Sequence, residues 1–241
     1  MTRLEVIPVD GLPEITRGAD LAGLIAAAVE AGGERLADHD VVVVTQKVVS
    51  KAEGAMAEVD PDDPLSHKPL VERESVRILR RRGELIVSET RHGFICANAG
   101  IDLSNVERGQ AALLPEDSDR SARRIRDGLS GRLGIDVAVI VSDTFGRPWR
   151  RGVTDVAIGS AGIRPVLDLR GTEDAYGREL QVTEVAIVDE IAGAADLVMG
   201  KATGVPVAIV RGVDLAAFGG DIGRAGVVSD VVRSPSEDLF R

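Results

Sequence analysis

The stretch DVVVVT at residues 40–45 decides the fold class of this chain of 241 residues. Its four consecutive valines are typical of a strand that is buried on both faces. A second buried strand is predicted from DVAVIVSD at residues 136–143. Apolar runs alternate with amphipathic ones along the rest of the chain, so the sequence predicts an α/β or α+β fold with helices packed on a mixed sheet. The order of the strands stays open.

The remaining elements are predicted outward from these two runs. Strands are expected at residues 4–9, 84–90 and 205–212, and helices at residues 19–37, 70–82, 116–133 and 183–201. Residues 146–182 are rich in Gly and Arg, and their structure stays open. From residue 219 onward we expect a glycine-rich loop and a tail.

Composition excludes several classes of protein. The chain has 39 acidic and 29 basic residues, a formal net charge of −10, one Cys and six aromatic residues. A single Cys excludes a disulfide framework and any multi-cysteine metal site, and the acidic balance argues against a nucleic-acid partner. No apolar run is long enough for a membrane helix, and no signal-peptide core is present. We therefore expect a cytoplasmic globular protein with no membrane partner, organised as one domain over residues 1–241 that could divide into two lobes.

The common phosphate-binding and hydrolase signatures are absent from the sequence. There is no P-loop, no G-x-G-x-x-G fingerprint, no G-x-S-x-G elbow and no H-E-x-x-H helix. The glycine cluster at residues 219–226 has the wrong spacing for a dinucleotide site. Charged substrates must therefore be handled by Asp, Lys and Arg.

Two polar segments are candidates for such a site. TQKVVSKAEG (45–54) follows the valine strand, and on a helical first turn Lys47 and Lys51 would share one face and could bind phosphate. A solvated lysine pair is the plainer interpretation. The loop around Gly100 carries oxygen ligands suited to Mg²⁺ or Mn²⁺, although by spacing alone an Asx-rich turn is favoured. Its polar residues are Asn98, Asp102, Ser104 and Asn105. Cys96 is expected to pack as a buried apolar residue.

A third segment, IVSDTFGRPWRRGVTDVAIG at residues 140–159, carries the strongest chemical signal. Asp143 ends a buried strand, and with the Thr144 hydroxyl its carboxylate could hold a metal ion. The dense positive cluster that follows suits phosphate or carboxylate, and it contains Arg147, Arg150 and Arg151. Two aspartates for a divalent cation and basic residues for phosphates form the apparatus of phosphoryl transfer. Glu184, Asp189 and Glu190 are interpreted as a solvated helix face.

At these segments the sequence resembles the coenzyme F420-0:L-glutamate ligase family, also called gamma-glutamyl ligase. The matching stretches cover most of residues 3–213 in the family's order: GLPEI, VVVVTQKVVSKAEG, RHGFICANAGIDLSNV, SDTFGRPWRRGVTDVAIGSAGI, YGREL, VTEVAIVDEIAGAADLV and GVPVAIVRG. The resemblance implies the gamma-glutamyl ligase fold. Relatives that carry a second, nitroreductase-like domain have it after this one, and none is expected before Arg241.

The resemblance implies a GTP-dependent ligase. GTP would phosphorylate the terminal carboxylate of the deazaflavin precursor, and the amine of L-glutamate would attack the acyl phosphate, leaving GDP and phosphate. Further glutamates would be added through the gamma carboxylate. Similar enzymes need magnesium or manganese, in some cases with potassium, and are homodimers.

The resemblance also implies roles for particular residues. Asp102 and Asp143 correspond to metal-binding carboxylates, and Thr144 to a ligand of a second metal. Positions that match nucleotide contacts are Leu12, Pro13, Glu14, Ile15, Gln46, Lys51, Asn105, Met199, Gly200 and Lys201. From the residue chemistry we add the hypothesis that the arginine cluster receives the phosphate or carboxylate of the deazaflavin substrate, with Asp143 and Arg150 as the residues expected to act in catalysis.

Two positions depart from the family pattern, and two other functions are weighed. Lys201 stands where archaeal members tend to carry Gln at the second metal, and its ammonium would repel a cation. Gln46 replaces a smaller hydroxyl residue, which alters a hydrogen bond. A metal-dependent phosphohydrolase would use the same aspartates with water as acceptor, and a nucleotide-sensing module would bind GTP without turnover.

Overall fold

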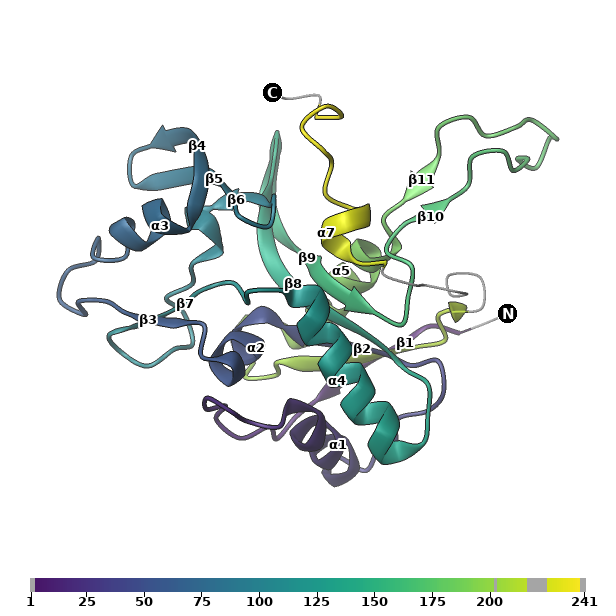
Figure 1. The fold of residues 1–241 in the computed structure, drawn as a ribbon. Coiled ribbons are helices and arrows are strands. Elements are labelled where there is room, and N and C mark those ends of the chain that lie inside the picture. The colour runs from purple at the N-terminus through teal and green to yellow at the C-terminus, as the bar shows by residue number, and fades with distance from the viewer. Residues whose placement is uncertain (1–2, 202, 216–224, 239–241) are drawn as a thin grey trace.

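A five-stranded mixed sheet forms the centre of the computed structural model, which describes residues 3–201, 203–215 and 225–238 (Figure 1). Its strands are ordered β1-β12-β2-β8-β9. Their bounds are β1 (Glu5–Val9), β12 (Val207–Arg211), β2 (Val41–Thr45), β8 (Ala138–Arg147) and β9 (Arg150–Ala161). Only β2 and β8 are parallel neighbours, and the other pairs are antiparallel. β2 ends at Thr45 beside Ser142, and β8 continues beyond that point to Arg147, paired with β9, so Asp143 does not end its strand as predicted.

Helices cover both faces of this sheet, which confirms the predicted fold class. All four valines of β2 are fully buried. Helix α4 (Ser118–Leu133) packs on β8 and β9 and against α1 (Leu21–Ala31), and α5 (Ile187–Met199) covers the other face (Figure 1). Two-sided burial explains why β2 and β8 lack the alternation of a half-exposed strand.

Close backbone contacts seat α4 on the sheet. A Cβ built on Gly159 of β9 would lie 2.3 Å from the carbonyl carbon and oxygen of Ser118. The buried carboxylate of Asp119 then accepts hydrogen bonds from the backbone N–H of Ser160 (2.8 Å) and Val227 (2.9 Å). The start of α4, strand β9 and the short helix α7 (Val227–Asp230) are thus joined at one point.

A smaller lobe has its own sheet and core. Strands β4 (Ser75–Arg82), β5 (Leu85–Thr90) and β6 (Ile95–Ala97) pair antiparallel beside helix α3 (Lys68–Glu74) and the short 3₁₀ helix η1 (Asn98–Gly100). Val71, Ile86 and Ala99 form its buried cluster. Strands β3 (Met56–Glu58) and β7 (Gln110–Ala112) connect it to α2 (Gln46–Glu53) and the main sheet (Figure 1).

The predicted helix at residues 70–82 is wrong beyond Glu74. The Ser75 hydroxyl donates to the Val71 carbonyl at the end of α3, and the chain then continues as β4. β4 pairs with β5 across a tight turn at Gly83, whose φ is +57°. Arginine is compatible with helix and strand alike, so the basic composition of this stretch hid the hairpin.

Residues 146–182, left open by the sequence, contain all of β9 and an arm. β8 and β9 form a long hairpin, and β10 (Leu167–Asp168) pairs with β11 (Glu184–Val185) at the base of a projection from the main body (Figure 1). The helix predicted from residue 183 begins only at Ile187. Of the expected loop and tail, residues 219–224 and 239–241 lie outside the described residues, and α7 occupies part of the remainder.

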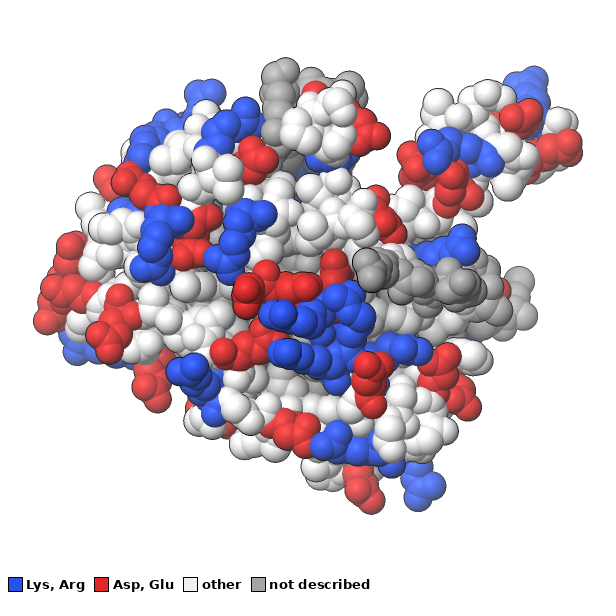
Figure 2. Space-filling model, in the orientation of Figure 1, with Lys and Arg blue, Asp and Glu red and all other residues white. Residues whose placement is uncertain are grey.

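Acidic and basic side chains are interspersed on the face shown in Figure 2. Arginines gather over α4 there, and ion pairs join Arg120 to Glu116 at 3.3 Å and Arg124 to Glu53 at 3.8 Å. In residues 3–201, 203–215 and 225–238, no helix is both long and apolar enough to cross a membrane.

Candidate active site

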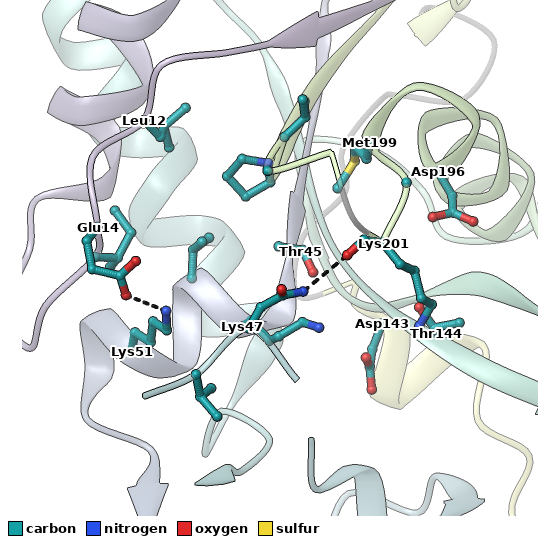
Figure 3. A pocket seen from close by; sticks show the side chains of 18 of the residues that line it. Leu12, Glu14, Thr45, Lys47, Lys51, Asp143, Thr144, Asp196, Met199 and Lys201 are labelled. Atoms are coloured by element: carbon teal, nitrogen blue, oxygen red, sulfur yellow. Dashed lines mark hydrogen bonds and ion pairs between the residues drawn. The ribbon is translucent and has the colours of Figure 1, made fainter. Parts of the chain in front are cut away.

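A cavity of about 650 Å³ opens at the carboxyl end of β2, beside Asp143 and Thr144 of β8 (Figure 3). Its walls come from the segment before α1, the first turns of α2, the loop after η1, the end of β8 with β9, and the end of α5 with the segment leading to β12. The lining residues on which its chemistry depends are Leu12, Pro13, Glu14, Ile15, Lys47, Lys51, Asn105, Asp143, Thr144, Asp155, Asp196, Met199, Gly200 and Lys201.

Nine of the ten residues predicted to contact a nucleotide line this cavity. Lys51 forms an ion pair with Glu14 at 2.5 Å, and the Asn105 side-chain amide donates to the Lys201 carbonyl at 3.2 Å (Figure 3). Gln46 is the exception, because its side chain is fully buried. Its amide donates to Ser50 Oγ (2.6 Å) and to the Leu113 carbonyl (2.7 Å), so it secures α2 from within.

Carboxylates crowd one end of the cavity. Burial raises the pKa of Asp143 to about 7, and the charges of Asp102 and Asp155 add to the effect. Burial, with a contribution from Asp155, also raises the pKa of Asp196. The positive charge of Lys201 opposes both shifts, and Figure 3 shows its side chain directed to Thr144 and Asp143. This end of the cavity therefore favours a positively charged occupant.

Asp102 is held by a lysine and by its own turn. Lys47 Nζ lies 2.8 Å from Asp102 Oδ2 and donates also to Ser104 Oγ at 2.9 Å. The Ser104 N–H donates to Asp102 Oδ1 at 2.7 Å, which is the Asx turn that the spacing favoured. Burial alone would raise the pKa of Asp102, but the hydrogen bonds from Lys47 and Ser104 hold it below its usual value.

Thr144 is hydrogen-bonded to Asp155, a residue that the sequence patterns did not indicate as part of the site. Its hydroxyl donates to Asp155 Oδ1 at 2.6 Å, and the buried Ser142 hydroxyl donates to Asp155 Oδ2 at 2.9 Å. Asp155 stands opposite Thr144 in the hairpin register. The motif DTFGRPWRRGVTD already contained both residues, but only the hairpin register places them side by side.

The donor set of the cavity fits Mg²⁺ or Mn²⁺. These hard cations are often bound through one or two carboxylates completed by water and substrate phosphates. Asp143 and Thr144 present oxygen atoms here, and a cation would offset the burial and the carboxylate repulsion that raise the pKa of Asp143. Asp102 would join them if its carboxylate released Lys47 and bound the cation instead. Among the described residues, no three His, Cys, Asp or Glu side chains form a complete metal cage, so phosphate or water ligands would be needed.

The other predicted positions lie elsewhere. The arginine cluster is at the tip of the β8–β9 hairpin. Arg147 stands opposite Arg150 in the strand register, and its guanidinium donates to the Arg151 backbone carbonyl at 3.2 Å. Burial, reinforced by the Asp143 charge, raises the pKa of Cys96 to about 12, so this residue is a buried neutral thiol.

Three further polar residues considered in the sequence lie outside the cavity and form hydrogen bonds or ion pairs within the fold. The side-chain Oδ1 of Asn98 accepts a hydrogen bond from Lys68 Nζ (3.2 Å) inside the small lobe. Glu184 pairs with Arg170 on the arm, and Asp189 accepts the Ala157 N–H at 2.9 Å. Asp189 is therefore not part of a solvated helix face, because its carboxylate accepts a hydrogen bond from the backbone of β9.

Comparison with known proteins agrees with this geometry. The family model for F420-0:Gamma-glutamyl ligase matches residues 11–212. Proteins named coenzyme F420:L-glutamate ligase are 44% identical in Methanothermobacter thermautotrophicus, 43% in Methanopyrus kandleri and 40% in Archaeoglobus fulgidus. In each case 99% of this chain is covered, together with 97–99% of the relative.

Proposed function

This chain belongs to the F420-0:gamma-glutamyl ligase family, and from that premise we propose that it joins L-glutamate to the coenzyme F420 precursor at the expense of GTP. It is a ligase, because the ligases to which it is related match nearly its whole length. The observation that carries the proposal is the cavity itself. Five segments far apart in the sequence bring lysines, carboxylates and a hydroxyl to one edge of the sheet, as phosphoryl transfer from a nucleotide requires.

The proposed reaction has two steps. The terminal carboxylate of the precursor attacks the γ-phosphorus of GTP, which forms an acyl phosphate and releases GDP. The glutamate amine then attacks the acyl carbon, an amide bond forms, phosphate leaves, and the amine gives up a proton. The same steps on the gamma carboxylate would add further glutamates. Lys51 and Lys47 can neutralise phosphate oxygens because both side chains line the cavity.

A divalent cation would be held by Asp143, Thr144 and Asp102. When bound, Mg²⁺ or Mn²⁺ supplies charge stabilisation for phosphate oxygens. The protein's own residues prepare that site, because the β8–β9 pairing fixes Asp143 and Thr144, and the Asx turn fixes Asp102. We further propose that the enzyme works as a homodimer, which light scattering would test, and that potassium can support activity.

The decisive experiment uses the purified protein with the precursor, L-glutamate, GTP and Mn²⁺, followed by mass spectrometry. The expected product is heavier than the precursor by one glutamyl residue, with GDP and phosphate formed in equal amounts. Phosphate release without glutamate would instead indicate a phosphohydrolase. Binding of GTP without turnover in any mixture would indicate a nucleotide-sensing module.

Arg150→Ala is expected to weaken binding of the precursor. Loss of one charge-assisted hydrogen bond to a phosphate or carboxylate costs about 1.5–3 kcal/mol, which corresponds to a rise in KM for the precursor of about 10-fold to 100-fold. KM for GTP should not change. Arg81→Ala, which removes an exposed arginine paired with Glu72 on the small lobe, serves as the matched control. Unchanged affinity for the precursor would remove Arg150 from the substrate site.

Lys201→Gln is expected to change metal stoichiometry. The Lys201 ammonium acts on Asp143 and Asp196 and would repel a second cation beside the first. Titration with Mn²⁺ in the presence of nucleotide, followed by electron paramagnetic resonance, should give one bound ion per wild-type chain and two per variant chain. Two ions in the wild-type protein would contradict this account of Lys201.

A further inference from the structure

Asp155 has no counterpart among the predicted ligands, yet its carboxylate is the most firmly placed in the cavity. It lies on β9 and is 5% exposed. The Thr144 and Ser142 hydroxyls donate to its two oxygens, one to each. Both donors come from β8, two residues apart and hence on one face of the strand, so the carboxylate is clamped by the hairpin.

These bonds determine what Thr144 can do. A threonine hydroxyl has one hydrogen to donate and two lone pairs to accept with. Because its hydrogen is committed to Asp155, the oxygen has only lone pairs left for the cavity that Thr144 lines. It can bind a cation or accept an N–H, but it cannot donate to a phosphate oxygen. The carboxylate also polarises the O–H bond, which makes the oxygen a better ligand for a cation.

Asp155 adds long-range charge to this local effect. Its charge is felt by Asp143 and by Asp196, which reach the cavity from β8 and from α5. Each of its oxygens accepts one hydroxyl hydrogen. Asp155 can therefore act on a bound cation through the Thr144 hydroxyl and through its electric field.

We infer that Asp155 is a positioning residue that turns the Thr144 hydroxyl into an acceptor directed at a divalent cation. This inference rests on the proposed function, because it concerns the cation of that reaction. The inference adds Asp155 to the proposed site as the residue that orients the Thr144 hydroxyl, a ligand of the cation. Partners of this kind typically contribute 10-fold to 100-fold to metal affinity.

The test measures Mn²⁺ binding by electron paramagnetic resonance with nucleotide present and without turnover. Asp155→Asn keeps the shape of the side chain, but its amide must donate to one hydroxyl, and the negative charge is lost. Mn²⁺ affinity should fall about 10-fold to 100-fold, while nucleotide affinity without metal stays constant. Asp189→Asn is the matched control, because it makes the same change in a carboxylate that accepts the Ala157 N–H outside the cavity, and it should leave Mn²⁺ affinity unchanged.

A double-mutant cycle decides whether Asp155 acts through Thr144. Thr144→Val in the wild-type background should weaken Mn²⁺ binding, and adding Asp155→Asn to it should cost much less than Asp155→Asn alone. Fully additive losses, or wild-type Mn²⁺ affinity in either single variant, would overturn the inference. If Asp155→Asn does not fold, Thr144→Val alone still tests it.

Ligase activity of the wild-type protein is measured separately by product mass. A protein that forms the glutamylated product but keeps its Mn²⁺ affinity in Asp155→Asn refutes only the inference. Absence of the product refutes the proposed function instead.

Discussion

Asp143→Asn should reduce ligase turnover by about a thousandfold or more, equivalent to about 4 kcal/mol of transition-state stabilisation. The carboxylate lies within β8, just beyond the stretch paired with β2, and inside the cavity, where the charges of Asp102 and Asp155 also reach it. An amide of the same shape cannot compensate a cation in the same way. The measurement is kcat for product formation at saturating Mn²⁺, and activity close to that of the wild type would remove Asp143 from the metal site.

The same substitution should stabilise the protein without metal above neutral pH. The pKa of Asp143 is about 7 in the folded state, above its value of 3.8 in an unfolded chain. Below the lower value the carboxyl is protonated in both states, so it contributes nothing. As pH rises toward 7 its ionisation increasingly favours the unfolded chain, and above 7 that cost is complete. Asparagine has no such cost, so the free energy of unfolding of the variant should exceed that of the wild type by a few kcal/mol at pH 8.

Asp189→Asn is the matched control for this pair of effects. Burial raises the pKa of Asp189 as well, and its carboxylate accepts the Ala157 N–H outside the cavity that contains Asp143. An asparagine oxygen can keep that bond. This variant should therefore retain ligase activity, whereas loss of activity in both variants would point to a general effect of altering buried aspartates.

Gly159→Ala should strongly destabilise the protein. The added Cβ would lie 2.3 Å from backbone atoms of Ser118, so no flexible side chain can move aside and α4 must shift on β9. We expect a loss of about 3 kcal/mol, which lowers Tm by about 6–12 °C in a chain of this size. Thermal unfolding followed by circular dichroism would measure it.

Gly131→Ala is the control for that prediction. Gly131 lies within α4, and nothing is within 4 Å of the position its Cβ would take. Alanine there should stabilise the protein by about 0.5–1 kcal/mol because it lowers the entropy of the unfolded chain. If Gly159→Ala were as stable as the wild type, the close seating of α4 on β9 would be wrong.

Much of the fold could be predicted because two strands each contain a continuous apolar run. Residues 41–44 and 138–141 carry no polar side chains that could face water, so they must lie in the interior of a sheet covered by helices. The hairpin at β4 could not be predicted in this way. Its arginines suit a helix as well as a strand, and its pairing with β5 depends on partners that a local pattern does not contain.

For the candidate site, the sequence by itself identified the chemical types: carboxylates after buried strands, lysines on a first helical turn, and a family resemblance that selected Leu12 to Ile15 and residues 199–201. Only the tertiary structure decided which of these residues share a cavity. Gln46 turns into the core, the arginines occupy a hairpin tip outside the cavity, and Asp155 joins Thr144. The physical reason is that hydrogen bonds and charges act over a few ångströms in space, and strand register and helix packing determine which side chains come that close.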